Sequence, residues 1–436
     1  MSKQFIQTPL GMPDILPKDQ AFWEKIQSVL KEFASFYGFK KIDTPILEYT
    51  EIFEKGIGPV SDIVEKEMYS LKTRGGDSLT LRPEGTAPIA RAYLQHGMQN
   101  LTQPVKLYYL GPFFRHERPQ EGRYRQFHQF GFEVLGERSP AIDAQVIQLS
   151  YRILEALKIK KLTILINSMG CSLCRPYFKK ILKNYLSAKG SQLCPTCKKR
   201  MKKNPLRVLD CKEEKCQRIK NQAPKIVDHL CEDCKGHFKE VLEFLDELRL
   251  PYILDHCLVR GLDYYTKTVF EIIPLSISDM KEGSGVDIKS QVALVGGGRY
   301  DDLIKLFSRR DVPAMGAAAG VERIMREIRN FGEIQSDHSK KPVVFIAQLG
   351  ELGKRKSLKL FDDFQKAKIL VAESFGRDNI KSQLKVADKL NVKYSLILGQ
   401  KEALEGTIIL REMDNGRQEI VKLDKIVEVV KRKLKK

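Results

Sequence analysis

The sequence predicts an α+β fold: a domain built on an antiparallel sheet flanked by helices, a cysteine-rich and mostly helical insertion within it, and a C-terminal α/β domain. Three observations support this prediction. Residues 107–136 form two strand patterns joined by a polar loop, eight of the nine cysteines lie in residues 171–234, and residues 342–436 alternate strand and helix patterns. A chain of 436 residues is long enough for two or three hydrophobic cores.

The same patterns divide the chain into five segments. They are a first domain part at 1–166, the insertion at 167–250, a second domain part at 251–330, a linker at 331–341 and the C-terminal domain at 342–436.

The net charge of +20 is concentrated in two of these segments. Residues 171–240 contain 18 Lys and Arg against 7 Asp and Glu, and residues 340–436 contain 23 against 13, so the rest of the chain is close to neutral. Basic segments supply affinity for phosphate backbones, although net charge also serves solubility alone. Both segments are too rich in apolar residues for disordered tails, so we expect folded modules.

Composition argues against a membrane protein. Hydrophobic residues make up 42% of the chain and charged residues 30%, and no apolar run is long enough to cross a bilayer. Residues 1–19 lack the apolar core of a signal peptide. We therefore expect a cytoplasmic protein with no membrane association.

The hairpin at Leu107–Gly136 is the stretch around which the first domain is organised. Its loop and strand ends carry several cationic side chains: Arg115, Arg118, Arg123, Arg125, His116 and His128. Guanidinium groups match phosphate oxygens in pairs, so this hairpin is a candidate platform for a nucleotide triphosphate. The alternative is a solvated charged hairpin. Gln129 and Glu133 lie four residues apart on the second strand, so both face the same side and can reach one small polar ligand.

The segments before the hairpin predict a helix, a strand and a helix entrance. Residues 20–37 have apolar side chains at helical spacing and end at Gly38. The strand that follows has Pro45 at its centre, which indicates an edge position and suits either an interface or a monomer. Farther on, Glu84 and Thr86 stand where a strand turns into a helix, a place for capping residues. Their carboxylate and hydroxyl also suit an ammonium ligand.

Three segments after the insertion complete the predicted domain. Residues 258–271 contain Arg-Gly-Leu-Asp-Tyr-Tyr, whose tyrosines suit core packing or the wall of a polar aromatic pocket. Residues 292–306 predict a strand, a glycine turn at 296–298 and a helix, without the spacing of a dinucleotide fingerprint. Residues 314–323 predict a strand of small residues that enters a helix.

Five of these segments, in order along the chain, resemble the motifs of class II aminoacyl-tRNA synthetases in their histidyl form. They are residues 20–48, FRHERPQEGRYRQFHQFGFEVLG (114–136), RGLDYY (260–265), VGGGRY (295–300) and residues 314–323. The resemblance implies an ATP-dependent ligase that joins L-histidine to tRNA(His) through a histidyl-adenylate. It also implies a homodimer, with Mg²⁺ on the ATP phosphates, and makes residues 342–436 an anticodon-binding domain.

The resemblance also implies roles for individual residues. Arg115 and Arg260 would be the catalytic arginines, on the α-phosphate and the substrate carboxylate. Arg123 and Arg323 would contact the outer phosphates of ATP. The histidine pocket would consist of Glu84, Gly85, Thr86, Gln129, Glu133, Arg260, Tyr264 and Tyr265, with Arg299 and Tyr300 beside it.

The cysteines of the insertion form three C-x-x-C pairs, with Cys211 and Cys216 between them. Disulfides are rare in the cytoplasm, and paired thiolates suit tetrahedral Zn²⁺. We expect one structural zinc site, formed by Cys194, Cys197, Cys231 and Cys234 in the preferred pairing; reduced cysteines without a metal are the alternative. The charge of the insertion favours packing against the tRNA acceptor arm.

Two other classes of protein share some of these features. One is a regulatory relative of the family that senses histidine without catalysis, which typically lacks the C-terminal module and degrades the loop arginines. The other is an RNA-binding protein that uses only the basic segments. The arginines at 115, 123, 260 and 323 are all present, which favours the enzyme.

Overall fold

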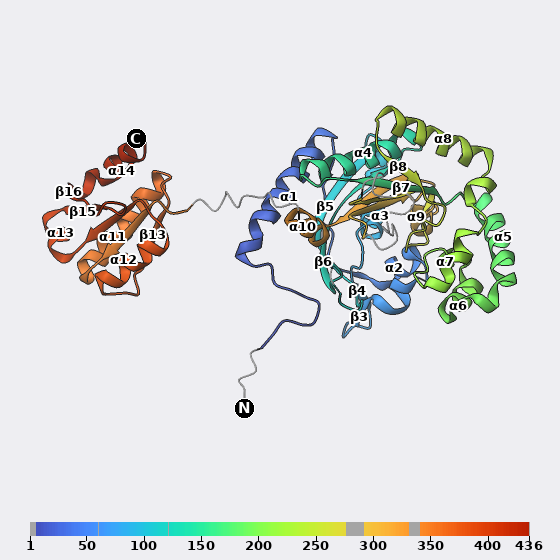
Figure 1. The fold of residues 1–436 in the computed structure, drawn as a ribbon, viewed down its shortest axis with the longest axis horizontal. Coiled ribbons are helices and arrows are strands. Elements are labelled where there is room, and N and C mark those ends of the chain that lie inside the picture. The colour runs from blue at the N-terminus through green and yellow to red at the C-terminus, as the bar shows by residue number, and fades with distance from the viewer. Residues whose placement is uncertain (1–5, 60, 121, 276–291, 331–340, 436) are drawn as a thin grey trace. The chain divides into compact units, whose positions relative to one another are not determined.

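The chain forms two compact units, Met1–Ile334 and Gln335–Lys436, each with its own sheet (Figure 1). The structure is a computed structural model that describes residues 6–59, 61–120, 122–275, 292–330 and 341–435. Nearly all of the predicted linker at 331–341 therefore lies outside the described residues.

The first unit is built on an eight-stranded sheet with the strand order β1-β5-β6-β11-β10-β9-β7-β8. Neighbouring strands are antiparallel from β5 to β7 and parallel only where β1 joins β5 and β8 joins β7. The prediction of an antiparallel sheet flanked by helices is confirmed, with a parallel pair added at each edge. The strands are β1 (Lys40–Lys41), β5 (Val105–Phe114), β6 (Gln126–Leu135), β7 (Thr163–Ser168), β8 (Tyr252–Leu254), β9 (Thr266–Ile273), β10 (Val295–Arg299) and β11 (Ala314–Gly320).

The predicted hairpin is β5 and β6, paired in continuous register from Val105 opposite Leu135 to Phe114 opposite Gln126. Its strands are long because both are rich in aromatic residues, which favour the pleated conformation. The register places the arginine-bearing loop at one end of the central sheet, next to the N-terminal end of the helix that follows β11.

Helix α1 (Pro17–Phe36) contacts both α4 (Pro140–Ala156) and α10 (Val321–Asn330) on one face of this sheet. Trp23, Ile147 and Ile324 belong to a single core with Phe132 of β6. Burying each such side chain contributes roughly 1.5–3 kcal/mol. Helix α1 ends where predicted, because Gly38 takes a left-handed conformation (φ +78°) that other residues rarely adopt.

The strand predicted around Pro45 is wrong in one respect: the chain forms two short strands that belong to different sheets. Proline has no N–H to donate to a ladder, so pairing stops there and resumes at Leu47. A second sheet of three strands results, with α2 (Thr50–Ile57), α3 (Thr86–Gln95) and α9 (Leu303–Ser308) packed together nearby. Its strands are β2 (Leu47–Tyr49), β3 (Tyr69–Lys72) and β4 (Ser78–Leu81).

The glycine turn predicted at 296–298 is also wrong, because Gly296, Gly297 and Gly298 lie inside the buried strand β10. Neighbouring groups occupy the space that side chains would need. A Cβ at Gly296 would fall on the guanidinium of Arg260, and a Cβ at Gly298 would lie 2.8 Å from the ring of Tyr265. The glycines serve close packing under two pocket residues rather than a change of direction.

The insertion is mostly helical, as predicted, and its helices lie together at one side of the first unit (Figure 1). Phe178, Leu182 and Ile219 pack in one core with Tyr264 and Tyr265 of the domain body. Its helices are α5 (Cys174–Ala188), α6 (Pro195–Lys203), α7 (Glu214–Asn221) and α8 (Glu232–Glu247).

The second unit is an α/β domain with the strand order β13-β12-β14-β15-β16. Its first three strands in that order are parallel and the last two antiparallel. The elements are β12 (Val344–Gln348), α11 (Gly350–Lys366), β13 (Val371–Glu373), α12 (Ile380–Lys389), β14 (Tyr394–Leu398), α13 (Gln400–Glu405), β15 (Thr407–Glu412), β16 (Gln418–Lys422) and α14 (Ile426–Leu434). Among the described residues of both units, no helix has the length and apolar character needed to cross a membrane.

Candidate active site

A pocket of about 990 Å³, including its open mouth, lies over the middle strands of the large sheet. The hairpin, β9, β10, β11 and the segment before β9 contribute its lining. Of the predicted site residues, the pocket is lined by Glu84, Gly85, Thr86, Arg115, Arg123, Gln129, Arg260, Tyr264, Tyr265 and Arg323.

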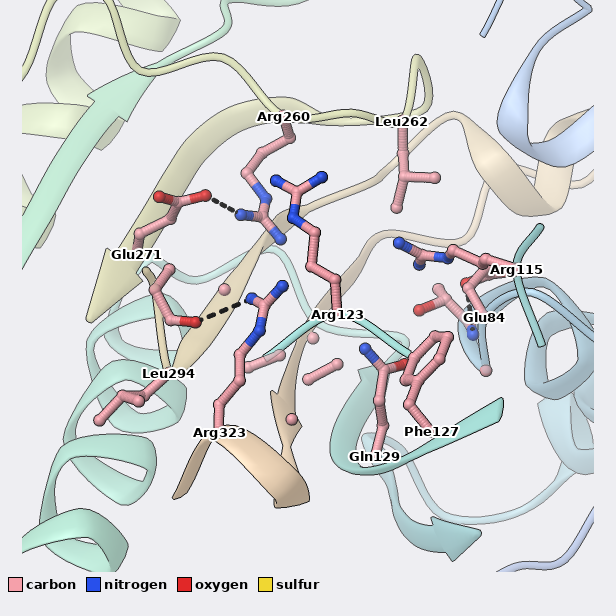
Figure 2. A pocket seen from close by; sticks show the side chains of 18 of the residues that line it. Glu84, Arg115, Arg123, Phe127, Gln129, Arg260, Leu262, Glu271, Leu294 and Arg323 are labelled. Atoms are coloured by element: carbon pink, nitrogen blue, oxygen red, sulfur yellow. Dashed lines mark hydrogen bonds and ion pairs between the residues drawn. The ribbon is translucent and has the colours of Figure 1, made fainter. Parts of the chain in front are cut away.

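Four arginine side chains from three separate parts of the chain project into this pocket: Arg115, Arg123, Arg260 and Arg323 (Figure 2). The two from the hairpin are joined through Glu117. Arg123 donates to a carboxylate oxygen of Glu117 at 3.1 Å, and an Nη of Arg115 lies 3.8 Å from the other oxygen. One carboxylate for two guanidinium groups leaves the pair with net positive charge.

Arg323, in the first turns of α10, is held by backbone acceptors rather than by a carboxylate. It donates to the carbonyl of Gly122 at 3.1 Å and to that of Ala293 at 3.0 Å. Burial, together with the charges of Arg123 and Arg115, lowers the pKa of Arg323 to about 10. Such mutual repulsion among cations is relieved by a bound polyanion, so the arrangement favours a phosphate-bearing ligand.

Arg260 differs from the other three because it has a carboxylate partner of its own. Its Nη1 is ion-paired with Glu271 of β9 (Figure 2). Burial opposes the charge of Arg260, but Glu271 overcomes this and raises the pKa of the guanidinium. The buried Nε of Arg260 has no hydrogen-bond partner among the described residues. An unpaired donor in a pocket is available to a ligand.

The opposite end of the pocket is built on two buried carboxylates. Glu84 accepts from the backbone N–H groups of Thr86 at 2.7 Å and Ala87 at 2.9 Å, so it caps helix α3. Its Oε2 also lies 3.4 Å from the hydroxyl of Tyr264. Burial raises the pKa of Glu84. Capping and ligand binding are compatible here, because the carboxyl lines the pocket while it holds the helix.

Glu133 lies behind the pocket lining rather than in it. The hydroxyl of Thr86 donates to one of its oxygens at 2.8 Å, and the hydroxyl of Tyr300 bonds the other. Burial raises the pKa of Glu133 to about 8. Gly316 leaves the space that this carboxyl fills. The predicted role of Glu133 with the imidazole stays a prediction, and Gln129 is the member of the pair that lines the cavity.

Tyr109 is a pocket residue that the sequence analysis missed. Its ring lies between Gly85 and Gly131, where a Cβ at either position would come within 2.5 Å of ring atoms. Its buried hydroxyl has no partner among the described residues. The signal available in the sequence was weak, because Tyr109 lies in the half of β5 where buried and partly buried residues alternate, as in any half-buried strand.

Arg299 and His128 do not face the pocket, contrary to the expectation from their motifs. Arg299 is fully buried and paired with Asp143 of α4, on the other side of the sheet. Strand alternation explains this, since Gly296 and Gly298 face the pocket residues and the odd positions face the helices. His128 points to Glu322, with an Nδ1 to oxygen distance of 2.9 Å. Neither side chain lines the cavity.

The predicted set of four zinc ligands is wrong, because the structure separates its two pairs. Cys194 and Cys197 lie with Cys211 and Cys216, whereas Cys231 and Cys234 lie with Cys171 and Cys174. The error has a topological cause: C-x-x-C spacing defines local pairs, and the fold of the insertion decides which pairs meet. All eight thiols are free.

An antiparallel sheet bearing an arginine-lined pocket, with a separate α/β unit after it, is the architecture of a class II aminoacyl-tRNA synthetase. The family model for histidyl-tRNA synthetase matches residues 11–324, and that for the anticodon binding domain matches residues 344–433. This chain belongs to the histidyl-tRNA synthetase family, which confirms the resemblance seen in the sequence motifs.

Individual relatives agree over the full length. The histidine–tRNA ligase of Dehalococcoides mccartyi is 44% identical over 428 residues, which covers 98% of this chain and 100% of the relative. That of Caldicellulosiruptor bescii is 42% identical, with 99% and 100% covered. The crystal structure of apo Staphylococcus aureus histidyl-tRNA synthetase matches with a TM-score of 0.76 at 34% identity, covering 98% and 99% of the two chains.

Proposed function

We propose that this protein is a histidine–tRNA ligase that attaches L-histidine to tRNA(His) in cytoplasmic translation. It uses ATP, forms a histidyl-adenylate and releases pyrophosphate and AMP. The observation that carries this proposal is the pocket itself, which joins a cluster of arginines to a wall of carboxylates and tyrosines. Such a site can bind a polyanion and an amino acid side by side.

The first step is attack of the histidine carboxylate on the α-phosphorus of ATP, with pyrophosphate as leaving group. Arg115 and Arg260 stabilise the charge that develops on the α-phosphate and align the carboxylate. Arg123 and Arg323 bind the outer phosphates. Catalysis by fixed charges and positioning needs no nucleophilic side chain.

The histidine side of the pocket is assigned by chemistry. Glu84 and Thr86 are suited to the ammonium group, as carboxylate and hydroxyl acceptors. Gln129, Tyr264 and Tyr265 enclose the imidazole, and Glu133 acts behind them through Thr86 and Tyr300. A ring held by specific polar partners is strongly preferred over analogues that lack its N–H groups.

Mg²⁺ would accompany ATP and would neutralise part of the charge on its phosphates. Two carboxylates of the lining, Glu271 and Glu322, are oxygen ligands of the kind that Mg²⁺ accepts. Structural Zn²⁺ in the insertion is part of the same proposal and would take no part in the chemistry.

The second substrate, tRNA, reaches the pocket from the side of the insertion. A larger cavity is lined both by Arg115, Arg123 and Arg260 and by the insertion residues Arg200 and Arg207. The lining of this cavity has nine Lys and Arg against seven Asp and Glu, and a net positive charge along one continuous cavity suits a phosphate backbone. The 3′-terminal ribose hydroxyl then attacks the adenylate, while the C-terminal unit binds the anticodon.

A homodimer is supported by strand β2. It turns the charged Glu48 inward, where it is ion-paired with Arg91, and turns Leu47 and Tyr49 outward, 41% and 58% exposed. An inverted pattern of this kind indicates that a second copy covers the apolar face. Tyr49→Glu is expected to convert a dimer to a monomer in light scattering; a native chain that is already monomeric would contradict the proposal.

The decisive test is histidine- and ATP-dependent exchange of labelled pyrophosphate into ATP without tRNA. We expect exchange with histidine and no other amino acid, abolished by Arg260→Ala. Arg138→Ala is the matched control, because Arg138 is exposed and paired with exposed Asp311. Histidine binding without exchange would support the regulatory relative instead. Binding of RNA alone, with neither histidine nor ATP bound, would support the RNA-binding class.

A further inference from the structure

The insertion contains two separate groups of four cysteine thiols. We name them by their place in the insertion. The neck cluster is Cys171, Cys174, Cys231 and Cys234, and the outer cluster is Cys194, Cys197, Cys211 and Cys216. In each cluster the four sulfur atoms lie within 4.8 Å of one another.

The sulfur–sulfur distances in both clusters agree with those expected around one tetrahedral ion. Cys171 Sγ lies 3.8 Å from Cys174 Sγ and 3.7 Å from Cys231 Sγ, and Cys194 Sγ lies 3.9 Å from Cys211 Sγ. Four sulfurs at about 2.3 Å from a central Zn²⁺ would be about 3.8 Å apart. A disulfide requires about 2.05 Å, so these pairs are not bonded to each other.

Backbone N–H groups are directed at the sulfurs in both clusters. In the neck cluster, the amides of Cys171 and Leu173 donate to Cys174 Sγ and Cys171 Sγ at 3.2 and 3.4 Å. In the outer cluster, the amide of Cys197 donates to Cys194 Sγ at 3.3 Å, and that of Cys194 to Cys216 Sγ at 3.4 Å. N–H donors favour the charged form of a thiol, which is the form that binds a metal.

We propose that the insertion binds two Zn²⁺ ions, one in the neck cluster and one in the outer cluster. Four thiolates in tetrahedral order are a ligand set for Zn²⁺ or for iron–sulfur chemistry. The close spacing of the sulfurs leaves room for a single ion and not for an iron–sulfur cluster. A closed set of four protein ligands marks both as structural centres.

The neck centre ties together the two ends of the insertion. Cys171 stands just after β7, where the chain enters the insertion, and Cys231 stands just before α8, where it returns. The adjacent Gly170 accepts a backbone bond from Lys267 of β9 at 2.9 Å. A metal here closes a loop of about sixty residues and anchors it to the sheet.

The outer centre holds the face of the insertion that touches the active-site segment. The chain between Cys197 and Cys211 carries Arg207, which is buried and donates to the carbonyl of Gly261 at 3.1 Å, one residue after Arg260. Asn204, from the same stretch, donates to Asp263 at 3.1 Å. The outer ion therefore fixes the groups that position the segment bearing Arg260.

The same face of the insertion also contacts two carboxylates of the domain body, Asp62 and Glu65. Arg200 of α6 donates to Asp62 at 2.9 Å, and Lys203 is paired with Glu65 at 2.7 Å. The chain from Cys197 to Cys211 can hold these contacts in place only if its own two ends are fixed. Cys194 and Cys197 at its start and Cys211 at its end are fixed once they bind the same ion.

Metal content of the purified full-length chain tests the two centres without reference to activity. Elemental analysis is expected to give two zinc ions per chain for the native protein. Cys194→Ser/Cys197→Ser and Cys171→Ser/Cys174→Ser should each retain one. Cys257→Ser, a cysteine outside both clusters, is the control and should retain two. A native chain with one ion, with none, or with iron in place of zinc would overturn the proposal.

Cobalt titration of the zinc-depleted native chain covers the case in which a variant fails to fold. We expect sulfur-to-cobalt charge-transfer absorption that rises to two equivalents and then stops. Saturation at one equivalent of cobalt, or absorption without the signature of tetrahedral thiolate ligands, would overturn the proposal of two metal sites. Thiol titration of the native chain with and without a chelator adds a second readout, because metal-bound thiolates should react only after the chelator removes the ion.

The positioning role of the outer centre rests on the proposed function and has its own readout. Arg207→Ala should keep two zinc ions per chain and lower kcat for pyrophosphate exchange about tenfold, with little change in the KM for histidine. Arg207→Lys should restore part of kcat, because its ammonium can still reach the Gly261 carbonyl. An unchanged kcat in Arg207→Ala would overturn this role. Absent exchange in the native chain would instead count against the proposed function.

Discussion

The hydroxyl of Thr86 donates to the carboxyl of Glu133 at 2.8 Å, which joins the first turn of α3 to strand β6 near its C-terminal end. The second oxygen of Glu133 bonds the hydroxyl of Tyr300, at the end of β10. One buried carboxyl thus connects three elements that are far apart in the sequence. Glu133 therefore holds the histidine side of the pocket in place, because it lies behind the cavity and bonds Thr86, which lines it.

Glu133→Gln is expected to change how stability depends on pH. The carboxyl titrates near 4.5 in the unfolded chain, and burial raises its pKa to about 8 in the folded one. Between these values the folded state keeps a proton that the unfolded state loses, so the stability contributed below pH 4.5 is lost as pH rises to 8. Glutamine resembles the neutral acid at all pH values. Thermal unfolding at pH 5 and pH 8 should therefore show a smaller decline for Glu133→Gln.

The control for this comparison is Glu405→Gln, since Glu405 is an exposed carboxylate in the other unit. It should follow the native curve at both pH values. Equal declines in the native protein and in Glu133→Gln would show that the proton of Glu133 does not distinguish the two states.

The elements that local patterns specify were predicted well. The aromatic hairpin, the helix that ends at Gly38 and the small-residue strand before α10 were predicted close to their observed positions. Each depends on periodicity or a single stop residue, and tertiary contacts do not override such strong local signals. Pocket residues that stand within such a local motif, such as Glu84 and Thr86 at the entrance to α3, were also predicted from the sequence.

The features that depend on long-range packing were not predictable. The side of the sheet on which Arg299 lies follows from the register of β10, and that register depends on which groups fill the space beside Gly296 and Gly298. The grouping of the cysteines depends on how the insertion folds, so Cys194 and Cys231 were wrongly assigned to one site. Spacing along the chain does not contain this information.

Arg299→Met is expected to be strongly destabilising. Arg299 and Asp143 form an ion pair with both side chains fully buried, and His237 contacts the second oxygen of Asp143 at 2.8 Å. Removing the arginine leaves a buried carboxylate with one partner, which costs about 3–5 kcal/mol. Denaturant unfolding of the full chain should show the loss. Because the pair lies away from the pocket, the KM for histidine should hold in whatever fraction stays folded.

Two further variants define the origin of that loss. Arg138→Met removes an arginine from the exposed pair with Asp311 and should cost about 0–1 kcal/mol. Asp143→Leu/Arg299→Met removes the buried carboxylate of Asp143 together with its partner and leaves only Asp301, which Arg299 contacts at 3.1 Å, without its ion pair. It should therefore be less harmful than the two single substitutions added together. Additive losses would mean that packing volume, rather than charge, dominates at this site.

Glu271→Gln is expected to slow adenylate formation without preventing it. Glu271 is the carboxylate partner of Arg260 and raises the pKa of its guanidinium. A neutral amide keeps a hydrogen-bond acceptor but orients the arginine less firmly, so kcat for pyrophosphate exchange should fall about tenfold, which corresponds to about 1.4 kcal/mol. Asp311→Asn, in the exposed pair with Arg138, is the control and should leave exchange unchanged. A rise in the KM for histidine at constant kcat would instead place Glu271 in substrate binding.

Tyr109→Phe is expected to weaken histidine binding, because the hydroxyl of Tyr109 lines the pocket and is the kind of unpaired buried group that a ligand completes. Loss of one hydrogen bond, about 0.5–1.5 kcal/mol, predicts a KM for histidine that rises by about two- to tenfold, with the KM for ATP unchanged. Tyr93→Phe is the matched control: its buried hydroxyl is satisfied by Gln103 at 3.2 Å, and it is not part of the lining. Should both substitutions alter the KM for histidine equally, the effect would come from the core that the two rings share rather than from contact with the substrate.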